Sequence, residues 1–190
     1  MAWVFGAAAI LGLPVAVLVQ ALRVPDHAVP TAPPKEQRAL TPLMVTAISS
    51  PQASSLDFNA AELNAHLAQA LVPPRGPAGD WTLQRIGVRL EPGKCEVLTL
   101  QKWGSWDIHL NVTYSVALKG NKTRLTPISG NLGRLSLGPF WIERFERPLL
   151  HLLPPLRKEI VLFNRLKDLR IEPDRVVLSV SVTAGMPDVK

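Results

Sequence analysis

Residues 2–22 carry no charged side chain, and this run divides the chain into a segment suited to a bilayer and a remainder suited to water. A helix of about 20 apolar residues spans the hydrocarbon core of a membrane and bonds its backbone groups internally. The run therefore predicts a transmembrane anchor over residues 1–23. The side chains expected to face lipid include Trp3, Phe5, Leu11 and Leu18.

Two other interpretations of this run are a cleaved signal peptide and a buried helix of a globular fold. A signal peptide has a basic start and a small-residue cleavage site, and neither stands beside this run, so a retained anchor is favoured.

Arg23, Lys35 and Arg38 follow the run, which by the positive-inside rule would place the domain in the cytoplasm. The uncharged run begins without the basic residues that usually precede a membrane anchor. We expect a basic leader upstream of Met1 to supply them. We therefore expect a single-pass protein of the cell membrane with an extracytoplasmic, periplasmic domain.

The next segment, residues 24–53, is rich in proline. Its prolines are Pro25, Pro30, Pro33, Pro34, Pro42 and Pro51. Because proline lacks an amide donor and favours extended backbone, such a tract predicts a semi-extended spacer. The more apolar residues 43–48 are compatible with an edge strand. The spacer would join the anchor to a single α+β domain over residues 54–185.

The domain is expected to begin with a helix and to continue with strands. Asn59 and Glu62 have the spacing of a capping box, and the apolar residues after them recur at helical intervals. Further along the chain the apolar period changes to two, most regularly over residues 106–118. This alternation is typical of an antiparallel sheet with one buried and one solvated face. Residues 120–121, Gly-Asn, predict a hairpin turn.

A second helical region is expected over residues 139–166. Apolar residues at helical spacing on its first half are Trp141, Phe145, Leu149 and Leu152. Pro154 and Pro155 would break or kink this helix. Residues 169–171 and 176–182 then predict a closing hairpin. The order of elements indicates an α+β fold, a curved antiparallel sheet packed on a long, kinked helix, preceded by the transmembrane helix.

The sequence contains no pattern typical of an enzyme or a metal site. The four histidines lie in distant segments without ligand spacing, so we expect no metal and no cofactor. Ser136 lies between glycines, but the spacing differs from that of a nucleophile elbow, and His151 lies in an apolar stretch. The net charge of +6 comes from basic residues mixed with acidic ones. This mixing is typical of a solvated face, so no nucleic-acid partner is expected.

Apolar side chains exceed what a small sheet and two helices would be expected to bury. They could form an ordinary core, or they could line a groove open to a lipid chain or another apolar ligand. The groove residues would be Ile108, Leu110 and Val112 of the sheet together with Trp141, Phe145, Leu149 and Leu152 of the helix. A different hypothesis is a structural adaptor that docks on a larger membrane-associated assembly. Its contact would be formed either by edge strands or by a basic helix face with Arg144, Arg147, Arg157 and Lys158.

Three segments resemble a known family. They are FNAAELNAHLAQAL, ISGNLGRLSLGPFWIERF and LKDLRIEPDRVVLSV, and they are similar to parts of small membrane-anchored envelope proteins of the YpmS and YceB type. The resemblance covers residues 55–183. It implies an N-terminal anchor, an extracytoplasmic domain whose sheet wraps a long helix as in the tubular lipid-binding (TULIP) proteins, and no enzyme activity. The chain departs from the family at Gly138-Pro139, where Leu-Pro is expected, and at Pro154-Pro155.

Overall fold

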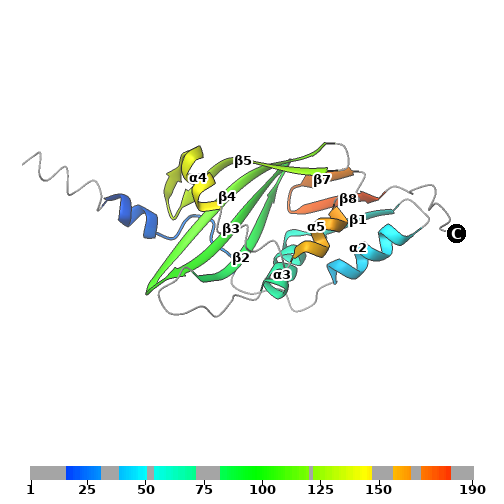
Figure 1. The fold of residues 1–190 in the computed structure, drawn as a ribbon, viewed down its shortest axis with the longest axis horizontal. Helices are drawn as coiled ribbons and strands as arrows, with labels where there is room; N and C mark the ends of the chain where they lie inside the picture. Colours follow the sequence, from blue (N-terminus) through cyan, green and yellow to red (C-terminus); the bar gives the residue numbers. More distant parts are fainter. Residues whose placement is uncertain are drawn as a thin grey trace, which may run out of the picture.

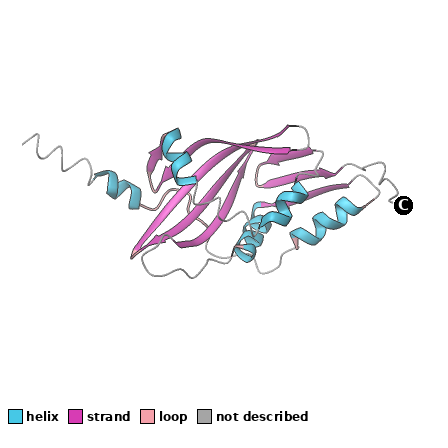
Figure 2. Ribbon diagram, viewed as in Figure 1, coloured by secondary structure: helices cyan, strands magenta, loops and turns pink. Residues whose placement is uncertain are grey.

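The computed structural model describes residues 16–30, 39–50, 54–71, 82–119, 122–146, 156–163 and 168–180. These residues form two antiparallel sheets and several short helices (Figure 1). The larger sheet occupies one part of the molecule. The smaller sheet and three of the helices gather beyond its far end (Figure 2). The predicted α+β class with antiparallel pairing is therefore confirmed.

The larger sheet is a five-stranded meander in which each strand pairs with the next one along the chain. Its strands are β2 (Thr82–Glu91), β3 (Lys94–Trp103), β4 (Trp106–Lys119), β5 (Lys122–Leu132) and β6 (Leu135–Leu137). Gly93 and Gly104 adopt positive φ in the two tight turns that flank β3. Glycine is suited to these positions because it has no Cβ to clash in the left-handed region.

The alternation over residues 106–118 is realised in β4. Ile108, Leu110, Val112 and Tyr114 are buried on one face, while Asp107 on the other face is exposed. The second face is not solvated throughout, however. Asn111 is buried there, and its Nδ2 donates to the carbonyl oxygen of His27 at 2.9 Å. Residues 24–30 thus lie on this face of the sheet.

The smaller sheet has the order β1-β8-β7 and consists of β1 (Ser54–Asn59), β8 (Arg175–Val180) and β7 (Asp168–Glu172). The hairpin β7–β8 is the closing hairpin expected from sequence. Strand β1 was not expected, and it pairs with β8 so that Phe58 lies opposite Val176. The two sheets are joined at the β2–β3 turn, where the amide of Gly93 donates to the carbonyl oxygen of Ile171 at 3.0 Å.

The labelled helices are α2 (Leu40–Ser49), α3 (Ala60–Ala70), α4 (Pro139–Glu146) and α5 (Arg157–Phe163). The capping box of α3 is present as predicted. The amide of Glu62 donates to Asn59 Oδ1 at 2.8 Å, and the amide of Asn59 donates to Glu62 Oε2 at 2.9 Å. These bonds satisfy two amides that a helix N-terminus leaves without intrahelical partners.

Helix α2 replaces the edge strand expected over residues 43–48, so that expectation was wrong. Its buried residues Leu40, Met44 and Ala47 follow helical spacing and join the core cluster that contains Phe58 and Leu178. Pro42 is tolerated because it lies in the first turn, where an amide has no intrahelical acceptor. The residues interpreted as a spacer therefore include a helix packed into the core.

The long, kinked helix expected over residues 139–166 is not shown. Among the described residues this region contains two short helices, α4 and α5, and the residues between them lie outside the described part. Ile142 of α4 packs beside β4, β5 and β6, whereas α5 lies beside α2. Figure 1 shows them at different ends of the molecule. Pro154 and Pro155, which lack amide donors, immediately precede the turn that opens α5.

The predicted anchor lies mostly outside the described residues, including Trp3, Phe5 and Leu11. Residues 16–22, which contain Leu18, are helical. In the described part of the chain, no helix has the length and apolar character needed to cross a bilayer. The helix over residues 16–22 is attached to the β5–β6 turn, where the amide of Arg134 donates to the carbonyl oxygen of Gln20 at 2.9 Å.

Candidate ligand-binding cavity

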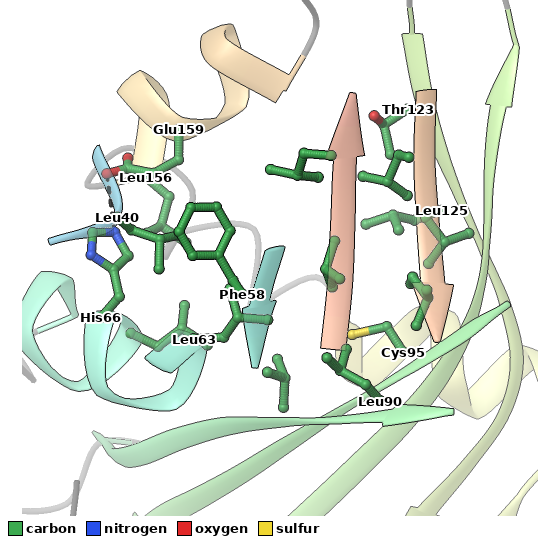
Figure 3. Close-up of a pocket in the computed structure, with 17 residues that line it drawn as sticks. Leu40, Phe58, Leu63, His66, Leu90, Cys95, Thr123, Leu125, Leu156 and Glu159 are labelled. Atoms are coloured by element: carbon green, nitrogen blue, oxygen red, sulfur yellow. Dashed lines mark hydrogen bonds and ion pairs between the residues drawn. The ribbon is translucent and has the colours of Figure 1, made fainter. Parts of the chain in front are cut away.

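An apolar cavity of about 410 Å³ lies between the two sheets and the helices at the far end of the larger sheet (Figure 3). Protein interiors are close-packed, and voids much larger than a water molecule are few. Small-molecule sites typically have volumes of roughly 300–1,000 Å³ and mostly apolar walls. The cavity therefore has the size and character of a ligand site.

The smaller sheet and α3 form one wall of this cavity. Strands β1, β7 and β8 contribute Phe58, Leu169, Ile171, Val176 and Leu178, and α3 contributes Leu63 and Leu67. Local patterning explains why these side chains share one side. Leu63 and Leu67 are four residues apart on a helix, and Val176 and Leu178 are two residues apart on a strand. Phe58 and Leu178 are completely or almost completely buried, so this wall is continuous with the core.

The larger sheet forms the facing wall. Its contributions are Val88, Leu90, Cys95, Val116, Thr123 and Leu125. Leu125 is also exposed at the molecular surface, so it lies at the rim. The hydroxyl of Thr123 is buried, and within the described part of the chain it has no hydrogen-bond partner.

A polar cluster closes the helical end of the cavity. Glu159 of α5 accepts a hydrogen bond from Thr41 Oγ1 at 2.8 Å, and the same oxygen lies 3.1 Å from His66 Nε2 of α3. Burial raises the pKa of Glu159, but hydrogen bonds from its own backbone amide, Thr41 and His66 outweigh burial, so the pKa falls below the ordinary glutamate value. The carboxylate is therefore ionised at neutral pH and binds α2, α3 and α5 together.

Cys95, the single cysteine of the chain, lies at the large-sheet end of the cavity (Figure 3). Burial raises the pKa of its thiol to about 11, and the charge of Glu96 adds to this shift. Because the thiolate is the nucleophilic form, a thiol with such a pKa is inert near neutral pH. Cys95 therefore contributes apolar surface to the cavity.

The described residues contain no group of three or more His, Cys, Asp or Glu residues that could hold a metal ion. Ser136 is exposed on β6, and His151 lies outside the described residues. Most of the side chains that line the cavity are leucine, isoleucine and valine.

The structure places the residues predicted for a groove apart from this cavity. Ile108, Leu110 and Val112 are buried on β4, and the last two pack with Ile142 of α4 in a separate core cluster. Trp141 is 53% exposed on α4. The side chain of Phe145 and the whole of Leu149 and Leu152 lie outside what the structure describes.

The apolar faces of α3 and β8 can be recognised in the sequence, but the sequence does not indicate that both line the same cavity. Each face carried a clear local signal, the spacing of Leu63 and Leu67 and the alternation of Val176 and Leu178. No local signal identified β1, because its six residues, Ser54–Asn59, include two serines, an aspartate and an asparagine. Phe58 was for that reason missed.

The chain matches no family model, and no curated protein matches it. By its fold and its pocket, the chain is an α+β domain of two antiparallel sheets with a largely apolar pocket between them.

Proposed function

We propose that this chain is a non-catalytic domain that binds an apolar ligand, such as the acyl chain of a lipid, in the cavity between the two sheets. The observation that carries this proposal is the volume of about 410 Å³ walled by leucine, isoleucine, valine and phenylalanine side chains. An apolar molecule that enters this space gains dispersion contacts with the side chains that line it.

The proposal keeps the ligand class expected from sequence and moves its site. The groove was expected between the sheet and a long helix, whereas the cavity lies between the two sheets and involves α3 and α5. The proposal also retains the anchor over residues 1–23 and a domain outside the cytoplasmic membrane. The support for these is the uncharged run of residues 2–22 and the resemblance to the membrane-anchored envelope proteins with TULIP-like folds.

The adaptor hypothesis has less support. Arg144 is exposed on α4, and Arg157 and Lys158 are exposed on α5. Because α4 and α5 lie at different ends of the molecule (Figure 1), these residues do not form one basic surface. Arg147 lies outside the described residues.

Photo-crosslinking tests the proposal on the full chain in membranes. A fatty acid with a photoreactive group on its alkyl chain should label peptides that contain Leu63 or Val176, as located by mass spectrometry. Val116→Phe places a larger side chain in the cavity and should abolish this labelling. Val161→Phe makes the same change at an exposed position of α5 and should leave labelling intact.

Leu63→Phe fills the cavity from the opposite wall. It serves as a second cavity variant if Val116→Phe does not fold. Thermal unfolding of each variant establishes that it is folded. Labelling that is absent in the wild type, or that is unchanged in both folded cavity variants, would refute the proposal.

A further inference from the structure

Exposed apolar side chains gather at the end of the molecule opposite the cavity. The described residues include twelve large hydrophobic side chains that are exposed, and eight of them belong to three segments at this end. The eight are Val17, Leu18, Val19, Val24, Trp103, Trp106, Phe140 and Trp141. Exposed apolar side chains that gather in one region of a domain are candidates for an interaction surface.

Backbone contacts hold the three segments at the same end. The amide of Gly133 donates to the carbonyl oxygen of His109 at 2.7 Å, which places the β5–β6 turn three residues from Trp106 along β4. The next residue, Arg134, donates to the carbonyl oxygen of Gln20. Strand β6 then leads directly to the start of α4. Figure 1 shows the helix over residues 16–22 and α4 at this end, far from α2, α3 and α5.

The aromatic residues at this end are of the kind that membrane interfaces select. Trp103 and Trp106 lie opposite each other at the β3–β4 turn, and they are 50% and 42% exposed. Phe140 and Trp141 stack edge to face with ring centroids 5.4 Å apart. Tryptophan is enriched at the headgroup level of bilayers because its ring is apolar and its indole N–H is polar.

We propose that this end of the domain lies on a lipid bilayer, with Trp103, Trp106, Phe140 and Trp141 at the headgroup level. The occupant is a bilayer and not a protein because the uncharged run of the sequence reaches the same end of the domain, where Arg134 of the β5–β6 turn bonds to Gln20. The run begins at residue 2, and its last residues, 16–22, form the helix that the β5–β6 turn holds. A run of this length matches a bilayer core of about 30 Å.

The basic side chains beside the patch suit the same partner. Lys102 precedes Trp103, and Arg144 is exposed on α4, whereas Arg134 of the β5–β6 turn pairs with Asp26 at 3.3 Å. Anionic headgroups attract such residues. With this end on the membrane, the cavity lies at the far end of the domain. A ligand would then be held away from the bilayer surface.

This inference rests on the anchor in the proposed function but not on ligand binding. The full chain, in a Cys95→Ala background, is labelled at single engineered cysteines with an environment-sensitive fluorophore and reconstituted in liposomes of zwitterionic and anionic phospholipids. Ser105→Cys reports on the turn between the two tryptophans, and Glu143→Cys reports on α4. Lys158→Cys, exposed on α5, is the matched control at the other end.

Labels at positions 105 and 143 should show a blue-shifted emission and several-fold stronger quenching by headgroup-level spin-labelled lipid than the label at 158. Equal quenching at all three positions, in protein that floats with the liposomes, would overturn the docking while leaving the anchor intact. Protein that fails to float would overturn both. Neither result would bear on the photo-crosslinking of the cavity, so failure of ligand binding is detected separately.

Discussion

The carboxylate of Glu159 lies 3.1 Å from the imidazole of His66, and this contact joins α5 to α3 across 93 residues of sequence. The same carboxylate oxygen accepts the hydroxyl of Thr41 from α2. One acidic side chain thus holds together the helices that close the end of the cavity. The side chain of Glu159 is only 12% exposed, so these bonds are little weakened by competing water.

Removing this carboxylate should destabilise the protein. Hydrogen bonds to charged groups contribute about 1.5–3 kcal/mol each, so we expect Glu159→Ala to lower the free energy of unfolding by at least that amount in urea titrations. Thr41→Val removes only one of these donors and should lower the free energy of unfolding by about 1.5–3 kcal/mol. An unchanged free energy of unfolding in Glu159→Ala would contradict the role assigned to this cluster.

The contribution of Glu159 should also depend on pH. Because its pKa is lowered in the folded protein, the carboxylate form stabilises the fold. That stabilisation is complete above the ordinary glutamate pKa of about 4.3 and is lost as the pH falls through the lowered folded value. The stability difference between wild type and Glu159→Gln should therefore shrink as the pH falls below about 4. Urea titrations of both proteins across this pH range measure the difference. A difference that grows on acidification would show that the pKa of Glu159 is raised in the folded protein, contrary to this prediction.

Gly133 should be intolerant of a side chain. Its φ is +57°, and an added methyl group would overlap the carbonyl oxygen of Ala21 and lie 2.6 Å from that of Arg23. Gly104 has a φ of +60°, and no atom lies near a methyl group added there. Gly104→Ala should therefore lower the free energy of unfolding only by the cost of a left-handed backbone at a residue with a Cβ, about 1–2 kcal/mol.

Gly133→Ala should lower the free energy of unfolding clearly more than Gly104→Ala does, because its methyl group also pushes residues 21–23 away from the β5–β6 turn. Faster tryptic cleavage after Arg23 in Gly133→Ala, but not in Gly104→Ala, would locate the damage. Equal losses of stability and equal cleavage in the two variants would show that the contact between these segments contributes nothing.

Cys95 should react slowly with alkylating reagents. Its thiol has a pKa of about 11 because its surroundings disfavour the charged thiolate, so little thiolate exists near pH 8. Iodoacetamide labelling followed by mass spectrometry should proceed orders of magnitude faster after unfolding in guanidinium chloride. An exposed cysteine, Val45→Cys on α2, serves as the internal standard. A bound ligand should slow labelling of Cys95 further without changing that of position 45, and rapid labelling of Cys95 in the folded protein would contradict its placement in the wall.

Local signals predicted the elements that are stabilised locally. The capping box of Asn59 and Glu62 is a contact over three residues, and the alternation along β4 follows from the period of a strand. Both can be recognised in one segment without its neighbours. Helix α2 was misread because a proline suggested an extended segment, whereas Leu40, Met44 and Ala47 are buried against partners distant in sequence.

The sequence by itself determined the class of fold and the antiparallel pairing. Only the tertiary structure decided where the cavity lies, because its walls come from segments that meet through long-range contacts. Phe58 reaches the site because β1 pairs with β8, and Glu159 closes it because α5 packs on α2 and α3. Side-chain periodicity specifies which face of an element is apolar, but it carries no information on which distant face will oppose it.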